Sequence, residues 1–307
     1  MTKSTYDEVV GTAWRQQQIW SCTADTLKAG ITRWRAAALV CGVVGAGLQT
    51  LAVQGVSLNA DLTKAAGYAG AVALALVPAI TAARLAGGQL REWIRARSVS
   101  EGLKSEVYLF LTRTDPYGGA DAVQQLLDRT HGIEQKARDL ARHAVVVEPA
   151  GTPLPPVSDA KSYVEHRVND QIEKYYRRKA RTLSRRVSLA RGVEFALGLL
   201  ATVLASISAV NAQAPVGSWV AVVTTATAAL TAHVAASRYE YLIVEFTSTA
   251  QRLEYLRNRW RAAAAGGLPY PDGDFIRDCE AAISVENQGW MAEWSRPDSP
   301  QGEPEQG

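Results

Sequence analysis

The segment Gly192–Ser237 reads GVEFALGLLATVLASISAVN, then AQAPVG, then SWVAVVTTATAALTAHVAAS. Each outer run has about 20 residues, which is the length that an α-helix needs to cross about 30 Å of hydrocarbon. The connector carries Pro215 and Gly217, two turn-forming residues, and no charge. Charged residues return directly on both outer sides, so the segment predicts a transmembrane helical hairpin with a very short loop.

A similar arrangement lies earlier in the chain. Ala36–Asn59 contains no charged residue, Asp61 and Lys64 mark a short loop, and Ala65–Ala83 forms a second apolar run. Pro78 lies inside that second run, where a membrane helix tolerates proline because neighbouring groups can satisfy the freed carbonyl. The sequence therefore predicts an all-α integral membrane protein with two transmembrane hairpins and four spans.

Charged helices are expected on the outer side of both hairpins. Gln89–Arg113 and Asp121–Ala144 follow the first hairpin, and the second of these segments has apolar residues at helical spacing. Ser158 or Asp159 is the expected N-cap of a long helix that runs into the second hairpin, and Asp274 is the expected cap of the last helix. We expect these helices to extend from the spans and to form a cytoplasmic helical body.

The same order of elements occurs twice, which predicts a parallel repeat. The expected division is 1–147 for the first hairpin with its helices, 148–157 for a Pro-rich linker, 158–296 for the second hairpin with its helices, and 297–307 for a disordered tail.

Charge placement predicts the orientation of the spans. The chain has 33 Lys and Arg against 30 Asp and Glu, for a net charge of +3, and the basic residues crowd the outer sides of both hairpins. The positive-inside rule then places both termini and the linker in the cytoplasm of a multi-pass plasma-membrane protein. The N-terminal residues lack the apolar core of a signal peptide, and three scattered cysteines do not suggest a disulfide framework.

Small and hydroxylated residues follow one face of the fourth span. Thr224, Ala228, Thr231 and Ala235 lie on this face, with Thr227 beside them. Such a stripe either lines a pore or lets neighbouring helices approach closely. The sequence favours close packing and leaves the pore as the sharper alternative.

Two ionisable residues lie within the apolar part of the second hairpin. Counting outward from the connector places Glu194 level with Ser237 and Arg238, with His233 about one turn deeper. Glu194 is therefore expected to pair with Arg238 or His233. Because intramembrane charges are often functional, a gate or proton-sensitive role is the alternative to a structural ion pair.

The strongest basic cluster precedes the second hairpin. Contact with anionic lipid headgroups explains it well, and an anionic nucleotide ligand or nucleic acid is the alternative. We expect the lipid bilayer to be the partner and expect no nucleic acid. The cluster consists of Arg177, Arg178, Lys179, Arg181, Arg185, Arg186 and Arg191.

Catalytic motifs are missing from the sequence. Gly42–Gly47, GVVGAG, resembles a phosphate loop, but no strand precedes it, and close helix packing explains it better. No cysteine pair has metal-ligand spacing, and the four histidines are scattered. We therefore expect a protein that is not an enzyme, with no cofactor and no metal.

Several stretches resemble the SLATT family, a two-span effector domain associated with nucleotide-synthesising and nucleotide-sensing partners in bacterial conflict systems. They are SYVEHRVNDQIEKYYRRKA, the short-looped hairpin, RYEYLIVEFTSTAQRLEYLRNRW and the closing FIRDCEAAISVENQGWMAEW. In the first half, SEVYLFLTRTDPYGG is similar to the matching segment of a sister SLATT type. The resemblance implies two tandem copies over nearly the whole chain.

The resemblance further implies a membrane effector that oligomerises and permeabilises or perturbs the membrane when it receives a signal. It supplies no site residues. Any nucleotide signal would come from a separate partner or bind the helices directly. The alternative is a membrane scaffold without a pore, whose cytoplasmic helices bind a partner or a nucleotide ligand.

Overall fold

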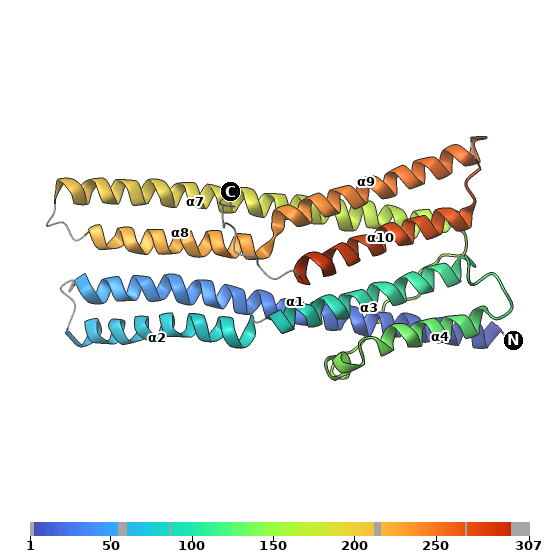
Figure 1. Cartoon of the computed structure of the whole chain (residues 1–307), viewed down its shortest axis with the longest axis horizontal. Coiled ribbons are helices and arrows are strands. Elements are labelled where there is room, and N and C mark those ends of the chain that lie inside the picture. Colours follow the sequence, from blue (N-terminus) through green and yellow to red (C-terminus); the bar gives the residue numbers. More distant parts are fainter. Residues whose placement is uncertain (1–2, 55–59, 86, 212–215, 268, 296–307) are drawn as a thin grey trace, which may run out of the picture. The chain divides into compact units, whose positions relative to one another are not determined.

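The computed structural model describes residues 3–54, 60–85, 87–211, 216–267 and 269–295. Every regular element within these ranges is a helix, and they contain no strand (Figure 1). This confirms the predicted all-α fold. The first half comprises α1 (Lys3–Gln54), α2 (Ala60–Arg84), α3 (Gly87–Leu111), α4 (Ala122–Gln135), the 3₁₀ turn η1 (Arg138–Leu140) and α5 (Ala141–Ala144). The second half comprises α6 (Ala160–Tyr163), the π-helical segments η2 (Val164–Val168) and η3 (Asp170–Arg177), α7 (Arg178–Val210), α8 (Gly217–Ser237), α9 (Tyr239–Ala264) and α10 (Asp272–Ser295).

Four helices of the described part of the chain are long and apolar enough to cross a membrane. These helices contain the described parts of the four apolar runs read from the sequence, and few residues of their apolar portions are buried by the protein itself. Such exposed apolar surface is stable only against lipid or another apolar partner. The chain is therefore an all-α membrane protein. Residues 55–59 at the end of the predicted first span, residues 212–215 of the predicted connector in the second hairpin, and the predicted tail 297–307 lie outside the described residues.

The chain forms two compact units, and each unit draws on both halves of the sequence. The membrane unit contains Ala29–Ala86 and Arg178–Glu245. The other, which we call the body unit, contains Met1–Lys28, Gly87–Arg177 and Phe246–Gly307. The compact units combine segments of both halves, whereas the predicted repeats divide the chain into consecutive segments. The predicted boundaries at residues 147 and 158 therefore stay a prediction.

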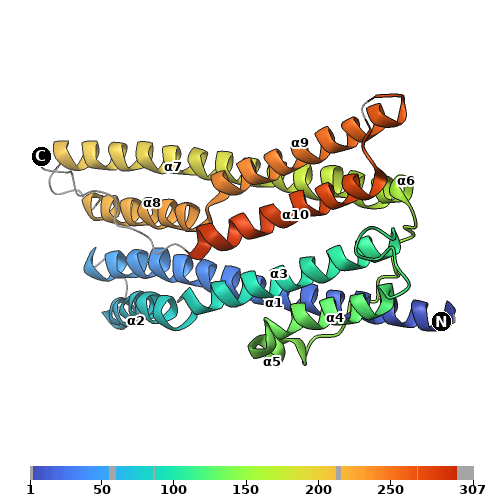
Figure 2. The same cartoon turned by 45° about the vertical axis from the view of Figure 1, so that its right-hand side comes forward.

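Within each unit, the neighbouring helices come from different places in the sequence. In the membrane unit, α7 lies along α8 and α1 along α2 (Figures 1 and 2). In the body unit, α10 packs along α3, and α3 packs on α4. A buried cluster on α1, α3 and α4 includes Val10, Val107 and Leu126. The apolar spacing read from the sequence therefore does build a core.

Two helix boundaries differ from those expected. The predicted helix Asp121–Ala144 breaks after Gln135, and the chain turns so that Ala137 and Leu140 become buried. The last helix begins at Asp272 instead of Asp274, because the Pro271 carbonyl already accepts the first helical hydrogen bond from Phe275 at 3.0 Å. The first boundary depends on burial in the tertiary structure, and the second on a backbone hydrogen-bond acceptor. The preferences of side chains for helix ends reveal neither.

Asp159 is the N-cap of the long helix, as the sequence allowed. Its carboxylate accepts a hydrogen bond from the Ser162 backbone N–H at 2.7 Å. The Asp159 backbone N–H in turn donates to the Ser162 hydroxyl oxygen at 3.1 Å, which completes a capping box. The helix then widens into the π-helical segments η2 and η3 before α7 begins. Long π-helical stretches are rare, and the sequence did not predict this one.

The Pro-rich segment 148–157 packs against α1. The Thr152 carbonyl accepts hydrogen bonds from Trp14 Nε1 at 3.0 Å and from Gln18 Nε2 at 2.8 Å. The Thr152 N–H donates to Gln18 Oε1 at 3.1 Å, and Val157 is buried. This segment connects the two halves while it is fixed to the body unit.

Candidate functional site

The first hairpin is closed by glycines. A Cβ added at Gly45 would lie 2.9 Å from Leu74 Cγ, and one at Gly70 would lie 3.0 Å from both the Gln49 nitrogen and the Gly45 oxygen. Gln49 Nε2 also donates to the Gly67 carbonyl at 3.0 Å. Such close approach of two backbones is what small residues permit in membranes. The close contacts of Gly45 agree with the helix-packing interpretation of Gly42–Gly47.

The second hairpin exposes a face of small residues on α8. Thr224, Ala228, Thr231 and Ala235 are all exposed, whereas Thr227 is half-buried beside them. The described exposed positions of α8 carry no side chain larger than threonine. They are Ser218, Ala221, Thr224, Thr225, Ala228, Thr231, Ala232, Ala235 and Ala236, which we call the small-residue face. Among the described residues this stripe stays exposed, so the close helix packing that the sequence favoured for it remains a prediction.

The hydroxyl groups of this region have well-defined partners. Thr224 Oγ1 donates to the Val220 and Ala221 carbonyls at 3.0 Å, and Thr225 Oγ1 donates to the Ala221 carbonyl at 2.7 Å. Hydrogen bonds of this kind occupy the hydroxyl proton but leave oxygen lone pairs available. The hydroxyls therefore present hydrogen-bond acceptors on an otherwise apolar helix.

Glu194 reaches the small-residue face from the neighbouring helix. It is half-buried on α7, and its Oε1 accepts a hydrogen bond of 2.7 Å from Thr231 Oγ1 on α8. The sequence had predicted Arg238 or His233 as partner, and that ion pair stays a prediction. Arg238 ends α8 in the left-handed conformation, with φ of 46°. A carboxylate held by a hydroxyl within an apolar hairpin is a candidate functional group.

The predicted basic cluster divides between the two units. Arg177 is half-buried in the body unit and forms ion pairs with Glu173 and, at 2.6 Å, with Glu254. The other members lie along the outside of α7 ahead of its apolar portion, where Arg191 pairs with Glu240. Their placement next to a span suits contact with headgroups. The exposed members are Arg178, Lys179, Arg181, Arg185, Arg186 and Arg191.

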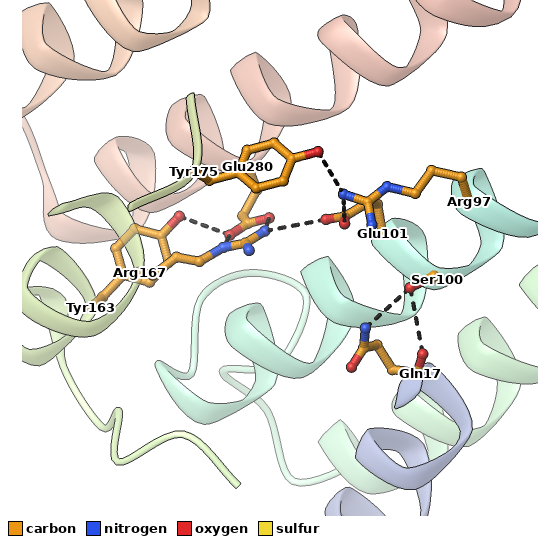
Figure 3. A network of polar contacts seen from close by, with 8 residues as sticks. All are labelled: Gln17, Arg97, Ser100, Glu101, Tyr163, Arg167, Tyr175 and Glu280. Carbon is orange, nitrogen blue, oxygen red and sulfur yellow. Dashed lines mark hydrogen bonds and ion pairs between the residues drawn. The ribbon is translucent and has the colours of Figure 1, made fainter. Parts of the chain in front are cut away.

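A second candidate site is a buried polar network in the body unit (Figure 3). Arg167 on η2 has a relative exposure of 1% and binds Glu280 of α10 through two hydrogen bonds, of 2.9 Å from Nε and 3.0 Å from Nη2. Tyr163 donates to the same carboxylate at 2.8 Å. The Arg167 guanidinium carbon also lies 4.6 Å from the centre of the Tyr108 ring, so an aromatic face covers a cation that lacks one hydrogen bond, at Nη1.

The first half of the chain contributes the other end of this network. Glu101 of α3 lies 4.0 Å from Arg167 and binds Arg97 at 2.7 Å, and Arg97 donates to the Tyr175 hydroxyl at 3.2 Å (Figure 3). Burial alone would raise the pKa of Glu101, but Arg97, Lys104 and Arg167 outweigh it and lower that pKa to about 2. The carboxylate is therefore ionised at neutral pH.

Lys104 has the opposite balance. Burial lowers its pKa to about 8, and the neighbouring Arg167 and Arg97 add to this, while Glu101 opposes it. The network thus joins α3 of the first half to η2 by the Glu101–Arg167 ion pair, and η2 to α10 by charged hydrogen bonds. Because the guanidinium and carboxylate groups have one another as partners, the arrangement serves to hold helices together and offers no open catalytic position.

Sequence reasoning missed this network. Tyr163, Arg167 and Glu280 all lie within the stretches that carried the family resemblance, and Glu280 is the acidic residue of the buried Cys279–Glu280 pair. The amino-acid sequence of those stretches therefore contained a signal for these three residues. Nothing in their spacing placed Arg167 beside Glu280, because 113 residues separate them.

One hollow of the body unit is large enough for a small molecule. Its volume is about 430 Å³, and Trp20, His131, Glu134 and Arg138 are among the residues that line it. Trp20 Nε1 donates to Glu134 Oε1 at 3.2 Å, so these two polar groups already have partners. The part of the chain that the structure describes contains no group of His, Cys, Asp and Glu arranged to hold a metal.

Two family models match separate parts of the chain. Residues 18–125 match a model described as a protein of unknown function, DUF4231. Because this half matches a different model, the tandem second SLATT copy has weak support. No curated protein and no solved structure matches the chain. Residues 163–290 match the model of the SMODS and SLOG-associating 2TM effector domain 1, so the second hairpin and its flanking helices are similar to a SLATT membrane effector domain.

Proposed function

We propose that this protein is a membrane effector of a bacterial conflict system, which oligomerises and permeabilises the membrane when it is activated. The observation that supports the proposal best is the small-residue face of α8, with Glu194 hydrogen-bonded at its edge. The similarity of residues 163–290 to a two-span effector domain supports the same function.

The physical argument concerns what covers the small-residue face. Exposed residues of α7, such as Phe195, Leu199 and Val203, are bulky and suit contact with lipid tails. The α8 face has small side chains and hydroxyl oxygens, which give lipid little contact area and leave acceptors unsatisfied in hydrocarbon. One helix face cannot enclose water by itself. Several copies arranged with these faces inward would surround a water-filled path.

Leakage from liposomes tests the proposal. Purified protein is reconstituted, and release of a small dye and of K⁺ is compared with that from a Thr224→Leu/Ala228→Leu variant. The leucines would fill the small-residue face without touching Glu194, so we expect leakage to fall strongly. Val203→Leu, on the bulky face of α7, is the matched control and should leak like the wild type. Crosslinking in the same liposomes reports whether the variant still assembles.

The alternative is a membrane scaffold without a pore. Its cytoplasmic helices would bind a protein partner or an anionic nucleotide, and the small-residue face would serve only for assembly. In that case the leucine variant would lose crosslinking, and wild-type liposomes would stay tight with or without candidate nucleotides. Leakage from assembled wild type, abolished in a variant that still assembles, would exclude the scaffold.

The orientation and partners are part of the proposal. The basic residues Arg178–Arg191 would lie at the anionic cytoplasmic leaflet of the plasma membrane, with both termini in the cytoplasm. A separate nucleotide-signalling partner would supply the trigger. Labelling of single cysteines introduced at Thr2 and Ser299 with an impermeant reagent tests the orientation in intact cells.

A further inference from the structure

We propose that Glu194, positioned by Thr231, makes the conduction path of this protein selective for cations over anions; this inference rests on the proposed function. Glu194 Oε1 accepts the 2.7 Å hydrogen bond from Thr231 Oγ1, and Thr231 is itself on the small-residue face. The carboxylate is thus held at the edge of the surface that would line the path.

The position of the pair along the hairpin places it near the charged end of the spans. Arg191 lies three positions before Glu194, and Arg238 lies seven positions after Thr231. At a rise of about 1.5 Å per residue, Glu194 is about 5 Å from the level of Arg191 along the helix axis. The carboxylate would therefore stand at the cytoplasmic mouth of a path, where an ion enters or leaves.

Arg191, the basic residue closest to Glu194 in the sequence, already has an acidic partner. Arg191 forms an ion pair with Glu240 of α9, and both side chains are about two-thirds exposed, at 68% and 66%. Had Arg191 paired with Glu194, the two charges would have cancelled at the mouth. Instead Glu194 accepts a hydrogen bond from the neutral Thr231 hydroxyl, which orients the carboxylate without adding a charge. A ring of such carboxylates, one from each copy, attracts cations and repels anions.

Farther from the charged end of the spans, Thr224 and Thr225 on the small-residue face also favour cations. The protons of the Thr224 and Thr225 hydroxyls are donated to backbone carbonyls within α8, so their oxygens are left as acceptors. Hydroxyl oxygens without a free proton can coordinate a partly dehydrated cation, and they offer nothing to an anion.

The test is the reversal potential in planar bilayers under a KCl gradient. Wild type should show a several-fold preference for K⁺ over Cl⁻. Glu194→Gln keeps an oxygen that Thr231 can bind but removes the charge, so it should conduct with the preference lost. Thr231→Val removes the orienting hydroxyl and should lower the preference, whereas Thr231→Ser, which restores the hydroxyl, should recover it. Glu165→Gln removes an exposed carboxylate from the body unit and is the matched control.

The outcomes separate the two proposals. If Glu194→Gln conducts with the same reversal potential as wild type, the selectivity inference is wrong and the permeabilising function stands. If Thr231→Ser fails to recover what Thr231→Val loses, the positioning role of Thr231 is wrong. If wild type carries no current in bilayers and causes no ion leak when expressed in cells, both the function and the inference fall.

Discussion

The two membrane hairpins use their small residues in different ways. In the first, Gly45 and Gly70 let α1 and α2 approach until a single added carbon would collide with the facing helix. In the second, a Cβ added at Gly217 would lie 2.6 Å from Ser208 Oγ, but one added at Gly198 would meet nothing within 4 Å, and many small residues of α8 are exposed. Glycines thus bring the backbones of the first hairpin together along the middle of its helices, whereas α8 of the second keeps small residues on an exposed face.

The outer surfaces of the two hairpins differ in their polar groups. The first hairpin exposes bulky side chains such as Val44, Val72 and Leu76, with alanines of α2 such as Ala69 and Ala75 between them. Its outer surface suits lipid. The second hairpin keeps its small residues, its hydroxyls and Glu194 at an exposed face, which suits contact with other copies and with water.

The largest expected effect lies where the two halves meet in the body unit. Arg167→Met leaves Glu280 buried without its cation and should cost about 3–5 kcal/mol of folding free energy. Arg97→Met, on the more exposed first-half end of the network, should cost clearly less. Thermal unfolding in detergent measures both. The double variant Arg167→Met/Glu280→Met removes both charges and should recover much of the loss; equal destabilisation in the single and double variants would contradict this account.

The glycines allow a direct comparison of the hairpins. Gly70→Ala places a carbon 3.0 Å from backbone atoms that cannot move aside, so it should destabilise by about 1–3 kcal/mol, as overpacking does. Gly198→Ala meets nothing and should leave stability unchanged or raise it by up to about 1 kcal/mol. The melting temperatures of the two variants, compared with that of the wild type in the same detergent, test both expectations. Similar losses at both positions would mean that the hairpins are packed alike.

Lys104 should make the junction of the halves sensitive to pH. Because its pKa is lowered from 10.5 to about 8, the unfolded chain binds this proton more tightly than the folded one between those values. Stability should therefore rise as pH increases from 8 towards 10.5, and the cost should be complete below pH 8. Lys104→Met should flatten this part of the profile. A wild-type and a variant profile that remain parallel across pH 8–10 would show that Lys104 is solvated.

The smallest expected effect tests the link between the hairpins. Trp219 Nε1 of α8 donates to Gln54 Oε1 of α1 at 3.1 Å, close to the loop end of both hairpins. Trp219→Phe removes this single hydrogen bond and should cost about 0.5–1.5 kcal/mol. Gln54→Leu should cost a similar amount, and the double variant should be no worse than either single one. Additive losses would indicate that the two side chains stabilise the hairpins independently.

The sequence by itself determined the membrane class of the protein and the places of its four spans. Those features depend on runs of about 20 apolar residues bounded by charge, and the physics that enforces them acts along one helix at a time. The Asp159 cap was predictable for the same reason, since a capping box needs only residues within one turn. The stripe of Thr224, Ala228, Thr231 and Ala235 was likewise visible from helical spacing.

The partners that these residues meet depend on the tertiary structure. Counting outward from the connector predicted an ion pair of Glu194 with Arg238 or His233, which stays a prediction, but it did not predict the hydrogen bond that Glu194 accepts from the Thr231 hydroxyl. The tertiary structure also turned the small residues of α8 outward while those of α1 faced a neighbour, and it placed Arg167 against Glu280 in the body unit. Helical spacing gives a face but not what lies opposite it, because that depends on side chains supplied by distant helices.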